Sequence, residues 1–221
     1  DVTMDRITRV RIQNVRAIAS LELELSKGIT VLIGENGAGK STILECLELL
    51  RRAAEPNFLS QFYEIHRGMP ALLRKGATSL TLGVTVEDDA GDLPRLDYDL
   101  TLAKQGAGAR ITNETLVIEE DESCGQPRTR VVRDEAEIRV YPPPSEVRSD
   151  PLPYQEDTWL RVFVNSLGNS DPLINSPHST LPDWLFDRLR ETLQAIEVHL
   201  GFDTRASWAA RAYQRPESLR V

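Results

Sequence analysis

The sequence predicts an α/β fold in which a mixed sheet packs around one central helix and an antiparallel β meander follows. The first observation is the stretch 34–42, Gly-Glu-Asn-Gly-Ala-Gly-Lys-Ser-Thr, which matches the phosphate-binding pattern G-x-x-x-x-G-K-[ST]. The second is its context, because a β-branched run at 28–33 precedes it and apolar residues at helical spacing follow at 43–52. The third is a change to period two over residues 78–140, which predicts successive antiparallel strands.

The residue types of this loop are those that phosphate binding needs. Three glycines let the backbone curl so that successive N–H groups point inward, and the start of a helix adds its positive end. Lys40 is expected to reach the β- and γ-phosphates, Ser41 to bind Mg²⁺ and Thr42 to bond near the α-phosphate. The predicted binding residues are Gly34, Glu35, Asn36, Gly37, Ala38, Gly39, Lys40, Ser41 and Thr42, with ATP and Mg²⁺ as cofactors. The alternative is a glycine-rich turn that fits the pattern by chance.

Composition restricts the class of protein. The 221 residues are 40% hydrophobic and 27% charged, as is usual for a soluble globular chain. No apolar run approaches the length of a membrane span and no signal peptide opens the chain, so a cytoplasmic protein without membrane contact is predicted. The two cysteines, Cys46 and Cys124, give neither a disulfide framework nor zinc spacing. A net charge of −8 disfavours a self-sufficient DNA binder, so any DNA contact needs a local patch or other parts.

Alternating residues at 7–13 and 21–25 predict two antiparallel strands that lead into a buried strand at 28–33. A short helix is expected over 69–76, closed by its glycine. The meander is predicted from the segments 79–87, 96–102, 109–111, 115–119, 128–132 and 136–140, with a turn at 112–114. A further strand at 159–165 precedes a helix after Thr180. Its expected apolar face, ended by Gly201, comprises Trp184, Leu185, Leu189, Leu193, Ile196 and Leu200.

A strand, a break read Asn14-Val-Arg16, a second strand and then the loop at 34–42 form an order that resembles the start of an ABC-type ATPase head. The likeness is greatest to the SMC/RecF branch, whose members work on DNA or in phage defence, and it covers roughly the first quarter of the chain. In that family the arginine of the break sits beside the nucleotide's phosphates, and the matching position is Arg16. An exposed charge at a strand end is the alternative for Arg16.

The resemblance also defines what this chain lacks. A complete head has a signature loop of the Leu-Ser-Gly-Gly type and a Walker B strand that ends in Asp-Glu, and neither follows Val164. The stretch 116–121 departs from Walker B, because Glu119 replaces the aspartate inside a hairpin, and a strand that runs into an acidic turn is favoured. Gln155 and Asn165 are the nearest candidates for the glutamine that contacts Mg²⁺, and that assignment stays open. The catalytic residues are therefore unknown.

The resemblance implies that residues 1–221 form one N-terminal ATPase lobe. It divides into nucleotide-binding strands, loop and helices (1–76), an antiparallel subdomain (77–141), a proline-rich linker (142–157) and a strand with helices (158–221). A C-terminal lobe with the remaining motifs is apparently absent. ATP binding is thus better supported than ATP turnover by this chain alone.

The expected function is an ATP-driven clamp in DNA repair, DNA maintenance or antiviral defence. In such a machine two heads form a homodimer or head-to-head dimer around nucleotide. The alternative is a nucleotide-gated assembly or regulatory subunit of a defence complex that controls an effector protein without acting on DNA. A transporter ATPase is disfavoured, because the meander occupies the place of that subunit's compact lobe. A small-molecule kinase is weaker still, because no acceptor site is recognisable.

Overall fold

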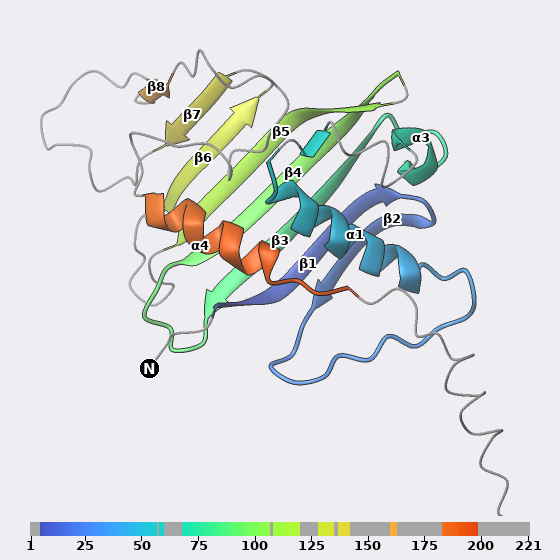
Figure 1. Ribbon diagram of the computed structural model, residues 1–221, viewed down its shortest axis with the longest axis horizontal. Helices are drawn as coiled ribbons and strands as arrows, with labels where there is room; N and C mark the ends of the chain where they lie inside the picture. The colour runs from blue at the N-terminus through green and yellow to red at the C-terminus, as the bar shows by residue number, and fades with distance from the viewer. Residues whose placement is uncertain are drawn as a thin grey trace, which may run out of the picture.

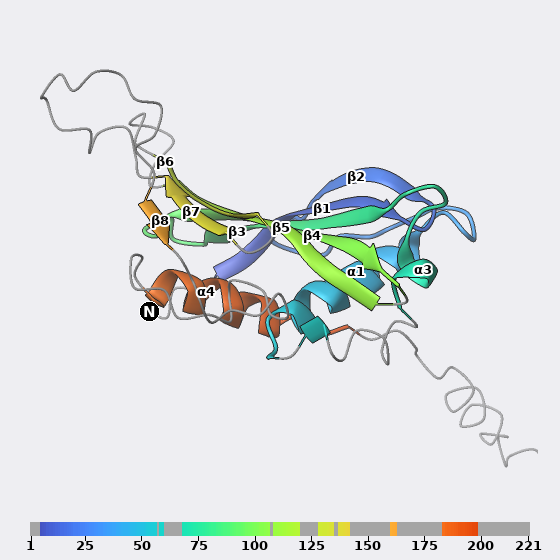
Figure 2. The same ribbon diagram turned by 90° about the horizontal axis from the view of Figure 1, so that it is seen from above.

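The structure is a computed structural model, and it describes residues 5–56, 58–59, 68–106, 108–119, 128–134, 137–141, 160–162 and 183–198. These residues form one eight-stranded sheet with helices against one of its faces (Figures 1 and 2). The strands are β1 (Asp5–Val15), β2 (Ile18–Glu24), β3 (Ser79–Asp88), β4 (Arg95–Gln105), β5 (Gly108–Glu119), β6 (Arg128–Asp134), β7 (Glu137–Tyr141) and β8 (Leu160–Val162). The helices are α1 (Lys40–Ala53), α3 (Met69–Leu72) and α4 (Asp183–Gln194). Within these ranges no helix has the length and hydropathy of a membrane span.

The strand order is β2-β1-β3-β4-β5-β6-β7-β8, and every neighbouring pair is antiparallel. Only the step from β2 to β3 leaves the meander order, and α1 lies in that connection. The period-two pattern sorts side chains between the two faces. Val10 pairs with Val84 on the helix-covered face, whereas Arg11 pairs with Gly83 on the open face. The predicted α/β fold with an antiparallel meander is confirmed.

Two helices from distant parts of the chain cover the apolar face of the sheet (Figure 2). Helix α1 buries Cys46, Leu49 and Leu50 there, at the spacing of one helix face. Helix α4 buries Leu189 and Leu193 on the same layer. The predicted face of α4 is thus confirmed at its centre.

The ends of α4 differ from expectation. Trp184 was expected in the core, but it is 47% exposed, and Phe186 is buried instead. Each helical residue rotates by about 100°, so position 184 points away from the arc that holds Leu185, Phe186 and Leu189. The helix ends at Gln194 rather than near Gly201, and the Gln194 side-chain amide donates to the carbonyl of Ala54 at 2.9 Å. This bond ties the end of α4 to the end of α1.

The strand predicted at 28–33 is not formed. Residues 25–35 run as a loop, and the side chains of Ile29, Val31 and Ile33 are 90, 69 and 92% exposed. A strand needs a neighbour for its backbone groups, and no described strand lies beside this segment. The sheet, predicted as mixed, is consequently antiparallel in every described pair.

The turn predicted at 112–114 was also wrong, because β5 runs through these residues. Thr101 pairs with Asn113 and Leu102 with Ile111, so Thr112 is the extra residue of a β-bulge. Glu114, two residues after Thr112, is buried in the core. The polar run reflects a bulge and a buried charge rather than a reversal of the chain.

The remaining predictions concern the helix at 69–76 and the segments that follow β7. The helix expected over 69–76 ends at Leu72, because Leu73 is already extended, and Gly76 belongs to the following turn. β4 and β5 are joined by a turn at Gly106, which has φ of 61°. The linker 142–157, most of the strand 159–165 and everything beyond residue 198 lie outside the described residues.

Candidate nucleotide-binding site

The loop at 34–39 leads directly into the first turn of α1. Gly37 and Gly39 have φ of 87° and 101°, a left-handed conformation that glycine adopts without steric cost. Gly39 is the N-cap residue, and no side chain caps the helix. Two of the three loop glycines, Gly37 and Gly39, thus have the left-handed conformation, whereas Gly34 does not.

The backbone N–H groups at this helix start are available to a ligand. In the described part of the chain the N–H groups of Lys40, Ser41 and Thr42 make no hydrogen bond, whereas Ile43 N–H donates to Gly39 O at 3.0 Å. A Cβ built on Gly37 would meet nothing within 4 Å, so the space beside the loop is open. Unpaired amides at the positive end of a helix favour an anion. These residues fit a phosphate group.

The ammonium group of Lys40 lies over the same loop. It donates to the carbonyls of Gly34 and Glu35, each at 2.7 Å. An ammonium group has three N–H donors, so one remains for an incoming oxygen. Lys40 is therefore held at the loop before any ligand arrives.

Arg16 lies in the turn between β1 and β2, with φ of 47°. Its Nη1 contacts both carboxylate oxygens of Glu45 on α1 at 2.8 Å, and its Nε donates to Ala71 O at 3.2 Å. The loop at 34–39 reaches the same region, because a Cβ on Gly39 would come within 3.2 Å of Ile18 Cγ1. The fold thus brings the predicted arginine and the predicted loop to one end of α1.

Cys46 follows Glu45 and faces the core. Burial, reinforced by the Glu45 carboxylate, raises the pKa of the Cys46 thiol to about 12. The thiol therefore stays protonated at neutral pH, and Cys46 is a small buried core residue.

Other elements of a nucleotide site are not located. Gln155 and Asn165 lie outside the described residues. The stretch resembling Walker B is the end of β5, which pairs with β4 and β6 on either side up to Glu119. Among the described residues no group of three or more His, Cys, Asp or Glu could hold a metal ion. Ser41 remains a predicted metal ligand, and no cluster of carboxylates that could share the ion is found among the described residues.

Two neighbours of the site were missed by sequence reasoning. Glu45 places a charge within the apolar run 43–47, five residues after Lys40. A charge at that position could have indicated a residue close to the site. The sequence around Ile18 gave no such signal. Its approach to Gly39 joins two distant segments, and the local pattern of each segment does not show that they meet.

Known proteins resemble this chain in sequence. A family model described as an AAA domain matches residues 9–142. The DNA double-strand break repair Rad50 ATPase of Methanopyrus kandleri is 54% identical over 43 residues, which are 20% of this chain and 5% of that protein. The DNA repair protein RecN of Deinococcus radiodurans is 28% identical over 145 residues, 65% of this chain and 23% of that protein.

The DNA replication and repair protein RecF of Bifidobacterium longum subsp. infantis is 27% identical over 108 residues, 48% of this chain and 24% of that protein. A solved structure titled as the recombination mediator protein RecF-ATP in the RecFOR pathway has a TM-score of 0.34 and 18% identity. It covers 54% of this chain and 28% of that chain. The chain therefore spans less than a quarter of the length of these three curated relatives.

The family model covers more than half of the chain, from the middle of β1 to the end of β7, and includes the whole stretch 34–42. The chain therefore belongs to this AAA domain family and is an ATPase head of the SMC/RecF-like, ABC type.

Proposed function

We propose that this chain is the ATP-binding lobe of an SMC/RecF-type ATPase that couples nucleotide binding to closure of a dimer in DNA repair or maintenance. The observation that carries the proposal is the start of α1, where three unpaired amides and the Lys40 ammonium converge on open space. A polyphosphate supplies the oxygens that these donors need. The names of the three curated relatives above all refer to DNA repair, which supports the pathway.

The residues at 34–42 have assigned roles in the proposal. The amides of the loop hold the phosphate oxygens, Lys40 neutralises the terminal phosphates, and Arg16 contributes a second cation from the β1–β2 turn. Ser41 is exposed at the first turn of α1 and would hold Mg²⁺ through its hydroxyl. A bound Mg²⁺ would neutralise phosphate charge there.

The exposed segment 28–33 supports a second part of the proposal. Ile29, Val31 and Ile33 are exposed although their sequence is that of a buried strand. We propose that a C-terminal ATPase lobe, carrying the signature loop and Walker B, covers this segment and supplies the catalytic groups. ATP hydrolysis then belongs to the completed head rather than to this chain alone.

The open face of the sheet near β1 and β4 is not proposed as a DNA-contact surface. The arginines described on these two strands are each paired with carboxylates: Arg6 with Glu87 and Asp89, Arg9 with Glu22 and Glu24, Arg11 with Asp97 and Asp99, and Arg95 with Asp97. Neutralised arginines give little attraction for a phosphate backbone. DNA contact is instead proposed to arise in the closed dimer.

Calorimetric titration of the chain with Mg-ATP tests the proposal. Wild-type chain is expected to bind, and Lys40→Ala is expected to lose binding while it keeps its thermal unfolding transition. Lys75→Ala is the matched control, because Lys75 is an exposed lysine in the turn after α3. No heat with wild-type chain, or equal affinity in Lys40→Ala, would refute the site.

A second experiment addresses the pathway. ATPase activity of the head completed by its C-terminal lobe is expected to rise when duplex DNA is added. Activity indifferent to DNA, together with a stable complex with an effector protein, would instead support the regulatory alternative.

A further inference from the structure

Arg16 is held by two elements besides its own turn. The carboxylate of Glu45 on α1 receives the Arg16 Nη1 hydrogens at 2.8 Å, and Ala71 O of α3 receives the Nε hydrogen at 3.2 Å. No hydrogen bond within the described residues uses the remaining nitrogen, Nη2. The Arg16 side chain is 40% exposed, so an incoming group can reach part of it.

The backbone that carries Arg16 is fixed as well. Asn14 and Arg16 have φ of 59° and 47°, a left-handed conformation that is unfavourable for side chains other than glycine. The end of α3 and the residues after it compensate, because Arg16 N–H donates to Leu72 O at 2.8 Å and Arg74 N–H donates to Asn14 O at 2.9 Å. A strained turn stabilised from outside has a defined direction for its side chain.

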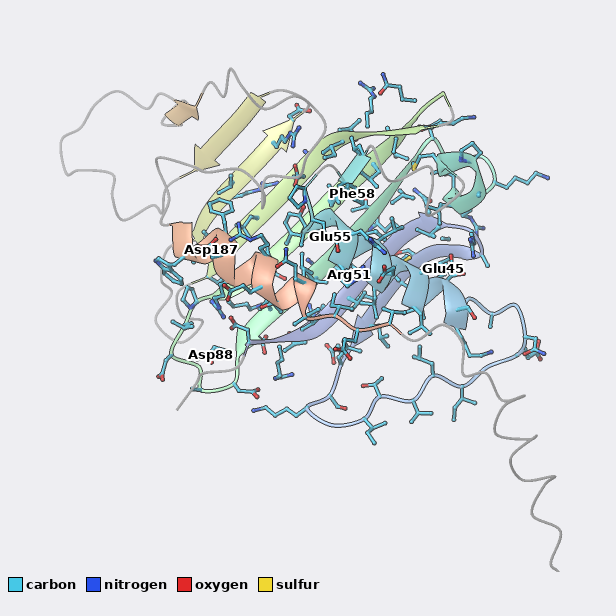
Figure 3. All side chains as sticks on the ribbon, in the orientation of Figure 1. Glu45, Arg51, Glu55, Phe58, Asp88 and Asp187 are labelled. Atoms are coloured by element: carbon cyan, nitrogen blue, oxygen red, sulfur yellow. The ribbon has the colours of Figure 1, made fainter. Side chains whose placement is uncertain are left out.

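The position of Glu45 relates this arrangement to the candidate site. Figure 3 shows Glu45 on the N-terminal half of α1, and side chains of a helix tilt toward its N-terminus. The Glu45 carboxylate therefore lies over the turn that contains Ser41 and Thr42, whose N–H groups are unpaired. Arg16 is held beside the place where the phosphate oxygens are proposed to bind.

We propose that Glu45 is a positioning residue that fixes the Arg16 guanidinium, with Nη2 free, toward the phosphates of the nucleotide. This inference rests on the proposed function. A partly exposed ion pair adds little to stability, whereas a long arginine side chain loses much of its freedom when its head is held. The main effect of Glu45 is therefore to preorganise the Arg16 side chain for ligand binding.

The test is calorimetric affinity for Mg-ATP in single and double variants. Arg16→Ala is expected to weaken binding about 10-fold or more, the size of one charge-assisted hydrogen bond. Glu45→Ala is expected to weaken it several-fold, and the double variant is expected to bind no worse than Arg16→Ala, because both changes remove the same contact.

Two conservative variants separate position from charge. Glu45→Gln keeps an oxygen acceptor at the same reach and is expected to retain most of the affinity. Glu45→Asp keeps the charge but shortens the side chain, so it is expected to bind more weakly than Glu45→Gln. The reverse order would overturn the inference, and this comparison remains informative if Glu45→Ala fails to fold.

Glu48→Ala is the matched control on the same helix, since Glu48 pairs with Arg51 and Arg52 at the opposite end of α1. It is expected to leave Mg-ATP affinity unchanged. If wild-type chain binds no Mg-ATP, the proposed function fails. If wild-type chain binds and Glu45→Ala binds equally well or more tightly, only the positioning role fails.

Discussion

Arg133 of β6 donates from Nη1 to the Glu114 carboxylate of β5 at 2.9 Å, and the two side chains are only 2 and 0% exposed. The hydroxyl of Tyr98 on β4 donates to the other carboxylate oxygen at 2.7 Å. Burial, followed by the charge of Glu114, raises the pKa of Tyr98 well above its ordinary value, so the hydroxyl remains a donor. A charged cluster thus lies inside the helix-covered side of the sheet.

Glu114→Ala is expected to lower the free energy of unfolding by about 3–5 kcal/mol, because it removes one charge of a buried, hydrogen-bonded ion pair. Tyr98→Phe removes a single hydrogen bond and is expected to cost about 1 kcal/mol. Urea unfolding measures both. Replacing both charged residues, with Glu114→Leu and Arg133→Met, is expected to recover much of the loss. A Glu114→Ala variant as stable as wild type would contradict this account.

Gly83 makes room for an ion pair on the open face. A Cβ there would lie 1.9 Å from Asp99 Oδ1 and 2.9 Å from Arg11 Nε, two atoms that are joined by a 3.0 Å hydrogen bond. Gly83→Ala is expected to displace Asp99 and to cost about 1–3 kcal/mol of stability. Thermal unfolding is the measurement.

The control for Gly83 is Gly28→Ala, since a Cβ on Gly28 would meet nothing within 4 Å. That variant is expected to be as stable as wild type. Adding Asp99→Ser to Gly83→Ala should restore part of the loss by shortening the clashing side chain. Equal effects of the two glycine substitutions would show that the clash is not the cause.

The Glu48 carboxylate near the C-terminal end of α1 is expected to make the free energy of unfolding depend on pH. Hydrogen bonds from Arg51, and then from Arg52, lower the pKa of Glu48 from 4.5 to about 2. The folded value lies below the unfolded value, so this stabilisation is present above about pH 4.5 and is lost as the pH falls toward about 2.

Glu48→Gln tests this pH dependence. At pH 7 it is expected to be less stable than wild type by under about 1 kcal/mol, because the pairs are partly solvated. The difference in melting temperature should close as the pH approaches 2. A difference that is constant with pH would indicate another origin.

Arg188 fastens α4 to the sheet. Its Nε contacts both carboxylate oxygens of Asp5 at 2.8 and 2.7 Å, and its Nη1 donates to Pro94 O. Arg188→Ala is expected to release α4, so that its amides exchange with deuterium faster while those of β3 and β4 remain protected. Arg190→Ala, which removes an exposed pair with Asp187, is the control and should leave the exchange of α4 unchanged.

Local patterns predicted the elements whose determinants are local. The glycines and Lys40 defined the loop, the spacing of Cys46, Leu49 and Leu50 defined α1, and strict alternation defined β3. In each case the residues that fix the conformation are neighbours in the sequence.

The failures have a non-local cause. Glu114 was placed in a turn because its partner, Arg133, is 19 residues away and adds no signal to the segment itself. The run at 28–33 has strand-forming residues, but a strand also requires an adjacent strand, and the sequence does not state which one. The contact of Arg16 with Glu45 likewise depends on how two elements meet.

The ion pair of Arg188 with Asp5 joins residues that are 183 positions apart in the sequence. A ribosome that adds roughly 5–20 residues per second needs on the order of ten to forty seconds to synthesise the chain between them. During that interval the strands that have already been synthesised would expose their apolar face to solvent, because α4 does not yet cover it. Newly made chain is therefore expected to depend on chaperones that bind such surfaces until α4 has been synthesised.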